Sequence, residues 1–405
     1  MSSVLGRLAY GELMVLFFIQ AAGMAIWMVP LGGILDSSGR HSLTAWAFAT
    51  TALASFVSPL LFGAMADRHI HPARLLRGLA TGSAFFMTLV GWSLHRHLAS
   101  GWILALIQCF SLTYAPMFSI STTLVLARLE NAPRDFGGVR ALATLGWMSG
   151  SLLVGLLNLD RSPITEFLGA AIWLVMAAFT FLLPDWKMPS AFEHLNWKER
   201  LGLDALALFR NRDIRLVFVT TTLFNIPLAA FYPYAPVHLH ALGLSNSGAW
   251  MSLAQVSELA AMFSLSWLMT RWNFKVIMLC GLALGILRFA LSSFNTPVGL
   301  VLGISLHGAS YVLVLMTGTV YLNQKVDPAW RTRAQSLLAL LNNGAGNLVG
   351  YLLAGFWMGA CSHPGGVNWS FFWGLEAVMA VAASVAFLIL GRSSGRPSVH
   401  PSAMA

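Results

Sequence analysis

The chain has 405 residues, of which 57% are hydrophobic and only 10% are charged. A soluble domain averages about 25% charged residues, so this composition excludes a soluble enzyme, a nucleic-acid-binding protein and a disordered chain. The formal net charge of +9 therefore raises the question of where the basic residues lie relative to a membrane. The three cysteines are far apart in the sequence, and they predict neither a disulfide framework nor a metal site.

Twelve mostly apolar runs follow one another along the chain, each of about the 20 residues that a membrane-spanning helix needs. Their approximate limits are 10–33, 43–66, 73–94, 99–127, 139–159, 164–184, 214–240, 247–271, 274–294, 297–323, 334–360 and 367–391. The first run is longer than the apolar part of a signal peptide and contains Glu12, so we expect a span rather than a cleaved segment. The predicted fold class is an all-α integral membrane protein with twelve transmembrane helices.

The basic residues predict the orientation of these spans. If the N-terminus is cytoplasmic, all but four of the 24 Lys and Arg residues fall in cytoplasmic segments. Arg40, Arg96 and Arg161 would lie outside, and Arg288 would lie within a span. Cytoplasmic loops carry the excess of Lys and Arg, so we expect both termini in the cytoplasm. The high net charge is explained without any nucleic-acid partner.

The longest interruption, residues 185–213, divides the chain into two halves of six spans, 1–184 and 214–392. We interpret it as a cytoplasmic loop, and the Pro- and Ser-rich segment 393–405 as a disordered cytoplasmic tail. Six plus six spans with the central loop inside is the plan of the major facilitator superfamily. In transporters of that plan the substrate site lies near the midplane, between the halves.

The loop after the second span carries a second sign of that superfamily. Its sequence, Gly63-Ala64-Met65-Ala66-Asp67-Arg68, resembles the G-x-x-x-D-R loop motif. Gly63 would permit close helix approach, and Asp67 could pair with basic residues or cap the next helix, a contact that would hold one conformation and break in the other. Arg68 completes the motif. These three residues are the predicted gate. The alternative is an ordinary basic turn, and the matching segment 270–275 of the second half lacks the acid.

Ionisable groups inside a membrane are costly and usually mark a pathway. Glu258 lies in the middle of the eighth predicted span, three residues after Gln255 and therefore on the same helix face. A carboxyl group at this depth could take up and release a proton, and we predict that it couples transport to protons. The alternative is a neutral, hydrogen-bonded glutamate that only ties helices together.

Arg140 and Thr144 lie four residues apart near the start of the fifth span and share a helix face. They are candidates for substrate binding, although Arg140 could also snorkel to the cytoplasm. In the tenth span Tyr311 accompanies His307, and in the first span Trp27 could stack on a planar ligand if it faces a cavity. Packing is the alternative for these aromatic residues.

Other intramembrane polar residues point to packing. We interpret Arg288 as a buried structural arginine, Glu376 and Glu12 as packing or interface groups, and the Asn- and Gly-rich stretch 342–350 as a hinge. No Walker loop, HExxH, GxSxG or Cys/His metal spacing occurs. We therefore expect no cofactor, no metal and no enzymatic activity.

Several stretches resemble one family more closely, the bacterial nucleoside:proton symporters of the major facilitator superfamily. They are 201–211, Tyr114-Ala115-Pro116, Arg140 with Thr144 and Gly146, 255–258, 286–291, and Ala334-Gln335. The resemblance implies uptake of nucleosides driven by protons. It also implies a ligand pocket in which Arg140, Thr144, Gln255 and Glu258 are the polar groups.

The chain departs from this family at two places. Family members place an acid beside an aromatic residue in the tenth span, where this chain has Tyr311-Val312. They also carry amide side chains in the seventh span, where this chain has Ala229 and Tyr232; Asn225, one turn earlier, is the residue that could compensate. The substrate could therefore be another nucleoside, a base or another compound, and proton coupling would depend more heavily on Glu258.

The sequence thus predicts a multi-pass transporter of a bacterial inner membrane that carries nucleosides with protons by alternating access. Its expected surroundings are the lipid bilayer, and its expected state is a monomer. The alternatives are a superfamily transporter of another small solute, such as a sugar, base or drug, and a non-transporting sensor. The predicted substrate-binding residues are Arg140, Thr144, Gln255, Glu258, Tyr311, Asn225 and Trp27.

Overall fold

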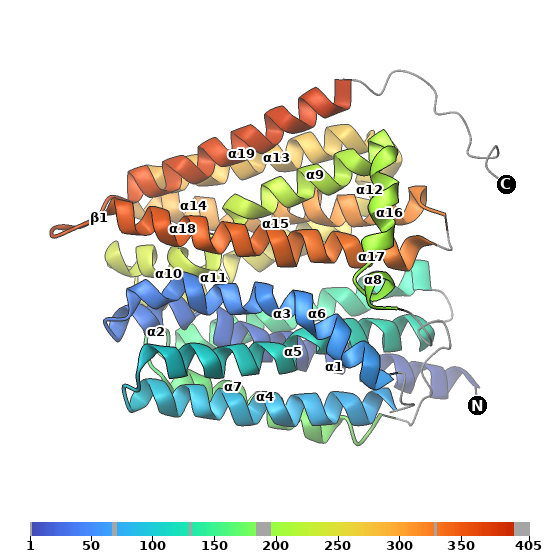
Figure 1. Ribbon diagram of the computed structural model, residues 1–405, viewed down its shortest axis with the longest axis horizontal. Coiled ribbons are helices and arrows are strands. Elements are labelled where there is room, and N and C mark those ends of the chain that lie inside the picture. The colour runs from blue at the N-terminus through green and yellow to red at the C-terminus, as the bar shows by residue number, and fades with distance from the viewer. Residues whose placement is uncertain (1, 67–70, 129–131, 184–195, 328–329, 393–405) are drawn as a thin grey trace.

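The structure is a computed structural model that describes residues 2–66, 71–128, 132–183, 196–327 and 330–392, with the side chains of all of these except 2–10, 58–66, 123–128 and 132–139. Nearly all of the described chain is helical (Figure 1). A helix satisfies its backbone polar groups within one segment, which a chain surrounded by lipid requires.

The helices of the first part of the chain lie together in the lower part of Figure 1. They are α1 (Ser2–Met28), α2 (Leu31–Ser37), the 3-10 helix η1 (His41–Leu43), α3 (Thr44–Ala66), α4 (Pro72–His95), α5 (Ser100–Arg128), α6 (Ala132–Leu156) and α7 (Ile164–Phe179). α1 packs against α6 and α7, and α4 packs against α5 and α7. We call this set the first helix group; the fully buried rings of Trp27, Phe48 and Trp173 lie in its core.

The remaining helices lie in the upper part of Figure 1 and form the second helix group. They are α8 (Trp197–Arg200), η3 (Leu203–Arg210), α9 (Arg212–Leu228), α10 (Phe231–Ala241), α11 (Ser247–Met251), α12 (Leu253–Arg271), α13 (Phe274–Ser293), α14 (Pro297–Ser305), α15 (His307–Tyr311), η4 (Val312–Met316), α16 (Thr317–Lys325), α17 (Arg331–Ala339), η6 (Leu340–Gly346), α18 (Asn347–Cys361) and α19 (Trp369–Arg392). A hairpin of β1 (Ser362–His363) and β2 (Gly366–Val367) joins α18 to α19. α19 packs against α13 and α9.

Each of the twelve predicted runs coincides with a helix or with helices that follow one another directly. Within the described ranges, eight helical stretches are long and apolar enough to cross a membrane. The other four predicted runs coincide with α3, with α6, with the shorter apolar helix α7, and with α11 and α12 together. The all-α membrane fold is therefore confirmed, and the count of twelve crossings stays a prediction.

Three predicted spans are less regular than the sequence indicates. The seventh is divided between α9 and α10, just after Pro227, which cannot donate a backbone hydrogen bond. The tenth and eleventh contain wide π-helical turns, η4 and η6. The turn η6 includes Asn342 and Gly344 of the stretch that we interpret as a hinge, and π-turns often occur at functional sites.

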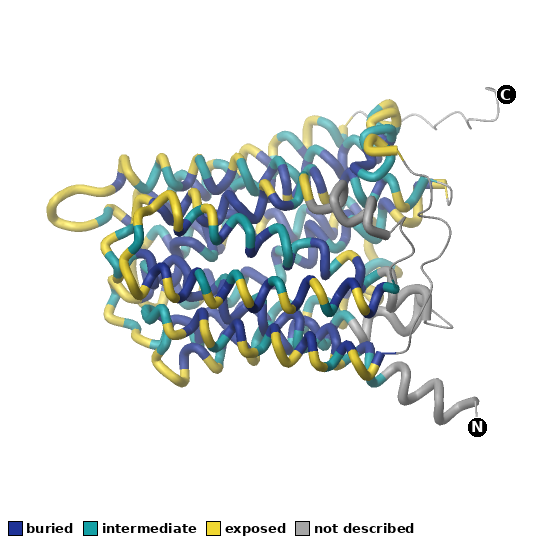
Figure 2. Tube along the Cα trace, turned by 60° about the horizontal axis from the view of Figure 1, so that its bottom comes forward, coloured by how far each residue is buried: buried dark blue, intermediate teal, exposed yellow. Residues whose placement is uncertain are grey.

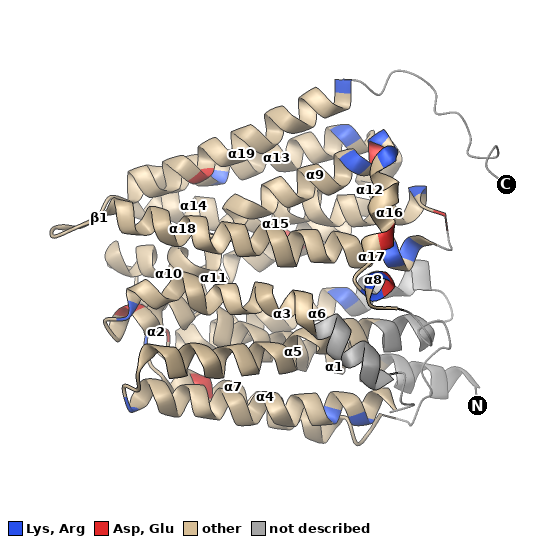
Figure 3. Cartoon of the chain, viewed as in Figure 1, with Lys and Arg blue, Asp and Glu red and all other residues tan. Residues whose placement is uncertain are grey.

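The surface fits a lipid environment. Large apolar side chains such as Phe263 and Phe356 are exposed on the outside, at 74% and 77%, and buried and exposed residues alternate along the helices in Figure 2. Lys and Arg gather near the ends of the helices and mostly at one end, so the middle of the molecule is nearly free of charge (Figure 3).

The predicted central loop is partly ordered. Within 185–213, α8 and η3 form short helices, which apolar periodicity alone does not reveal. Arg333 of α17 binds both Glu199 and Asp204, at 3.3 and 2.7 Å, and a Cβ on Gly202 would lie 2.7 Å from the backbone nitrogen of Leu337. This segment is therefore docked on the second helix group. Residues 393–405, the predicted tail, lie outside the described residues.

The two helix groups meet along several helices: α3 lies against α18 and η6, α6 against α11 and α12, and α2 against α10. At the end of α6, Asp160 accepts hydrogen bonds from the Ser247 hydroxyl and the Gly248 amide of α11, at 2.9 and 2.5 Å. A Cβ on Gly248 would lie 2.5 Å from the carbonyl oxygen of Ser151. The groups are therefore in backbone contact at this end, which closes it.

Candidate functional site

A hydrogen bond between the two helix groups marks the candidate site. The Thr144 hydroxyl of α6 donates to Oε1 of Glu258 in α12, at 2.9 Å, and it also lies 3.8 Å from the Met262 sulfur. Thr144 is 3% exposed. Glu258 and Met262 are one helical turn apart, so one face of α12 meets one face of α6.

Arg140 lies one turn before Thr144, as the four-residue spacing predicts. Its guanidinium carbon is 4.8 Å from the centre of the Phe118 ring, and it interacts with the Tyr311 side chain and electrostatically with Glu258. A cation from the first helix group is therefore within electrostatic range of an acid from the second. Tyr311 interacts with both.

Gln255 lies one turn before Glu258 on the same helix and is 2% exposed. The side-chain oxygen of Gln255, Oε1, is buried and has no hydrogen-bond partner among the described residues. An unpaired buried acceptor costs about 1–3 kcal/mol, so a ligand that donates a hydrogen bond there would recover this free energy. Gln255 is thus an available acceptor beside the charged residues.

Close helix packing fixes the position of Glu258. A Cβ on Gly308 of α15 would lie 2.5 Å from the Cβ of Glu258, so only glycine allows α15 to approach α12 this closely. The Ala309 amide donates to the Ser257 hydroxyl at 3.2 Å. The acid is therefore held on a rigid helix pair rather than on a loop.

Two aromatic residues that the sequence analysis did not assign to the site also lie between the helix groups. The rings of Trp147 in α6 and Tyr232 in α10 are 5.4 Å apart. The Trp147 indole nitrogen is buried without a partner among the described residues, and Tyr232 interacts with Glu258. The helical spacing in the sequence could have indicated Trp147, because it follows Thr144 by three residues and so shares its helix face.

The structure does not bring Trp27 and Asn225 to this cluster. Trp27 is fully buried in the first helix group, with its ring 5.0 Å from that of Phe110. The Asn225 amide donates to the Asn342 carbonyl and to Oδ1 of Asn347, at 2.6 and 2.5 Å. Both side chains are committed to helix packing in this conformation, and their binding roles stay predictions without geometric support.

The predicted gate is only partly described. The backbone of Gly63 belongs to α3, whereas Asp67 and Arg68 lie outside the described residues. Their gating role therefore stays a prediction. Among the described residues, no group of three His, Cys, Asp or Glu side chains could hold a metal ion.

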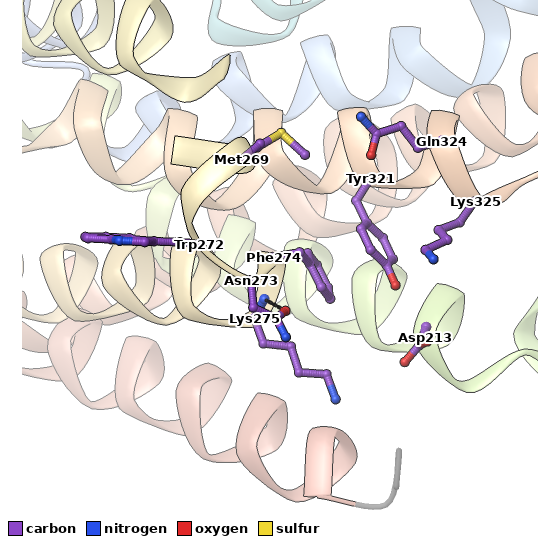
Figure 4. A pocket seen from close by; sticks show the side chains of 9 residues that line it. All are labelled: Asp213, Met269, Trp272, Asn273, Phe274, Lys275, Tyr321, Gln324 and Lys325. Atoms are coloured by element: carbon purple, nitrogen blue, oxygen red, sulfur yellow. Dashed lines mark hydrogen bonds between the residues drawn. The ribbon is translucent and has the colours of Figure 1, made fainter. Parts of the chain in front are cut away.

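A cavity of about 350 Å³ lies elsewhere, at the ends of α9, α12, α13 and α16. Figure 4 shows its lining, in which Tyr321 stacks on Phe274 at 3.8 Å between ring centres. The lysines Lys275 and Lys325 and the acid Asp213 also line it. None of the predicted binding residues belongs to it, so the cavity is separate from the Arg140 and Glu258 cluster.

Comparison with known proteins places this geometry in context. A family model described as nucleoside H+ symporter matches residues 9–396. YegT of Escherichia coli (strain K12) is 32% identical over 403 residues, which cover 95% of this chain and 94% of YegT. The nucleoside permease NupG of the same organism is 25% identical over 401 residues, covering 94% and 95% of the two chains.

Solved structures agree in fold. The crystal structure of the nucleoside transporter NupG superimposes with a TM-score of 0.84 and 23% identity, covering 95% of this chain and 100% of that chain. The POT family transporter PepTSo superimposes with a TM-score of 0.71 and 13% identity, covering 95% and 98%. The chain therefore shares the fold of these two solved transporters.

Proposed function

Because the chain belongs to the nucleoside H+ symporter family, we propose that it moves nucleosides across the bacterial inner membrane together with protons. It is a multi-pass membrane transporter and not an enzyme. The relatives favour this function over transport of another solute. A non-transporting sensor is likewise disfavoured, because the family is one of transporters.

The observation that carries the mechanism is the Thr144–Glu258 hydrogen bond, which joins the two helix groups at 2.9 Å. Alternating access moves such groups relative to each other around a central site. A contact that spans the groups at that site must break or change during the cycle. We propose that 1–184 and 214–392 are the moving halves and that 185–213 links them.

We propose that the nucleoside binds among Arg140, Gln255, Tyr311 and the ring pair of Trp147 and Tyr232. A nucleoside has a planar base and hydroxyl groups on the sugar. The rings offer faces for the base, and the arginine donors, the Trp147 N–H and the unpaired Gln255 oxygen offer hydrogen bonds. Ala229 offers no amide, so recognition rests on these groups and on Thr144.

Glu258 is the proposed proton carrier. It accepts the Thr144 hydrogen bond and interacts with Arg140, and both favour a carboxylate, whereas the surrounding apolar helices favour a protonated acid. A substrate that bonds preferentially to one of these two forms links its own binding to that of the proton, and this linkage is reciprocal.

The test is uptake of a panel of labelled nucleosides into proteoliposomes, with and without an inward proton gradient. Concentrative uptake of at least one nucleoside that disappears when the gradient is collapsed supports the proposal. Sugars and free bases in the same panel test the alternative substrates. Accumulation of a sugar or a base in place of every nucleoside would contradict it.

The proposed orientation has both termini in the cytoplasm, as the basic residues indicate. Single cysteines at Ser190 and Ser398 should then react with an impermeant reagent from the cytoplasmic side only, and one at Ser162 from the outside only. The reverse pattern would overturn this orientation. We also propose a monomer in the lipid bilayer, which the mass of the detergent-free protein in nanodiscs would test.

A further inference from the structure

The second helix group buries a cation that the proposed mechanism does not use. Arg288 of α13 is 2% exposed, and its guanidinium carbon lies 4.6 Å from the centre of the Phe231 ring and 4.4 Å from that of Phe289. It donates a hydrogen bond to Nδ1 of His307 in α15. Because a guanidinium does not lose its proton in proteins, the positive charge is permanent and needs a negative partner nearby.

Glu376 lies on α19, the helix that packs against α13, and it is the buried acid whose charge interacts with this cation. It is 1% exposed, and it interacts electrostatically with Arg288. Neither carboxyl oxygen has a hydrogen-bond partner among the described residues. A carboxylate left without hydrogen bonds at this depth is costly unless it is charge-compensated or protonated. The surroundings of Glu376 are therefore compatible with its protonated form.

The other groups around Glu376 do not replace Arg288 as a partner. Tyr234 of α10 and Cys361 of α18 interact with Glu376 and are neutral in their usual forms. His238 of α10 is hydrogen-bonded to Trp373 and Asn295. α9, which also packs against α19, shares an apolar core with it. Arg288 is thus the charge to which the state of Glu376 is linked.

A short chain of side chains connects Arg288 to the candidate site. Tyr232 of α10 interacts with both Arg288 and Glu258. The His307 ring stacks on Phe231 at 3.9 Å between centres and lies 5.9 Å from that of Tyr232. Gly308, the residue after His307, packs directly against Glu258. Arg288 therefore contacts α15, the helix on which Glu258 packs, and interacts electrostatically with Glu376.

We propose that Glu376 is a second proton-binding site, coupled to Glu258 through Arg288. A proton on Glu376 leaves the charge of Arg288 without its counter-charge, and this charge then favours the ionised form of Glu258. A proton bound at one acid thus promotes release from the other, so the pair titrates as one coupled system. The inference rests on the proposed function, since it concerns protons that the transport cycle uses.

The first half of the chain supplies a matched control. Glu166 of α7 is fully buried, and both of its carboxyl oxygens also lack a hydrogen-bond partner among the described residues. The Cβ atom of Glu166 packs against Gly91 of α4, in the core of the first helix group. Glu166→Gln removes an equally buried acid without touching Arg288.

The experiment is the pH dependence of nucleoside uptake in proteoliposomes for wild type, Glu376→Gln and Glu166→Gln. We expect a broad wild-type curve with two overlapping steps. Glu376→Gln should give a single step displaced by about one pH unit to lower pH, since coupled sites differ by at least about that much. Glu166→Gln should follow the wild-type curve.

Three results would overturn the inference. A Glu376→Gln curve that coincides with wild type means that Glu376 is not coupled to transport. A displaced curve with the same number of steps as wild type means that Glu376 is a fixed counter-charge and binds no proton. An equal displacement in Glu166→Gln means that any buried acid has the effect. If wild type shows no gradient-driven uptake, the proposed function itself has failed, and the inference with it.

Glu376→Asp protects the test against a variant that does not fold. Aspartate keeps a titratable carboxyl but retracts it from Arg288 by one methylene. The two steps should remain while their separation decreases, because the coupling weakens with distance. A Glu376→Asp curve identical to wild type, in protein that still exchanges nucleoside across the membrane, would argue against coupling through Arg288.

Discussion

The two helix groups differ in what surrounds their buried acids. In the first group the deeply buried acid Glu166 lies in an apolar core, without a hydrogen-bond partner in the described part of the chain. In the second group the buried acid Glu376 interacts electrostatically with Arg288, which in turn binds His307. An isolated acid is most stable when neutral, whereas an acid beside a permanent cation can exchange its proton at moderate cost.

The same division holds at the meeting of the two groups. The first group contributes the donors Arg140 and Thr144, and the second contributes the acid Glu258 and the acceptor Gln255. In the proposed mechanism, proton chemistry is therefore concentrated in the second group, and the first group supplies groups that stay in one charge state. This comparison predicts that removing a titratable group from the second group changes coupling, whereas changes in the first group alter affinity.

The largest effect is expected for Glu258→Gln. Glutamine keeps the shape of the neutral acid but cannot release a proton, so gradient-driven accumulation should be lost while exchange of nucleoside between the two sides continues. Parallel assays of uptake and counterflow in proteoliposomes measure both. A Gln variant that accumulates nucleoside with the wild-type pH dependence would remove Glu258 as proton carrier.

Arg140→Lys should have the next largest effect. Lysine keeps the charge but loses the planar fork of donors, and loss of a hydrogen bond to a ligand from a charged donor costs about 1.5–3 kcal/mol, or roughly ten- to a hundredfold in affinity. Direct binding of labelled nucleoside to the purified variant checks this. Near-normal affinity in well-folded protein would assign Arg140 a structural role in the first half of α6.

Helical spacing accounts for what the sequence could predict of the site. Arg140 with Thr144, and Gln255 with Glu258, are each about one turn apart, so each pair shares a face in any regular helix. Whether the two faces meet depends on the packing of α6 on α12, which the spacing within one helix does not contain. The resemblance to a known family supplied that step.

The same limit applies to Trp27 and Asn225, whose binding roles stay predictions, and to the residues that the sequence analysis missed. Apolar residues surround Trp27 along its run, so periodicity could not separate a core position from a cavity position. The partners of Asn225 come from η6 and α18, more than 100 residues away. The pairing of Trp147 with Tyr232 and the close approach at Gly308 likewise depend on contacts between helices. Fold class follows from composition and run length, whereas site membership needs the three-dimensional arrangement.

Thr144→Val should have a moderate effect. Valine matches the size of threonine but leaves Oε1 of Glu258 without its donor at a 2.9 Å contact. Loss of a hydrogen bond to a charged group costs about 1.5 kcal/mol, or roughly tenfold, and we expect this decrease in kcat/KM for uptake. Thr144→Ser keeps the hydroxyl and serves as control. Equal rates for the Ser and Val variants would show that the bond between the groups has no part in the cycle.

The smallest of these effects concerns the closed end of the molecule, where Asp160 accepts hydrogen bonds from Ser247 and Gly248 across the two groups. Asp160→Asn keeps an acceptor oxygen but removes the charge that strengthens these bonds. We expect a loss of about 1 kcal/mol, roughly a fivefold shift toward opening at this end. Ser151 is fully buried at this contact, so a cysteine at Ser151 should react about fivefold faster with an impermeant thiol reagent in Asp160→Asn than in the parent.

Because Asp160 lies far along the chain from the acids of the second group, the pH dependence of uptake should keep its wild-type shape. If the pH profile of Asp160→Asn changed as that of Glu376→Gln is expected to change, closure and proton binding would be one event. The proposed difference in role between the two helix groups would then be wrong.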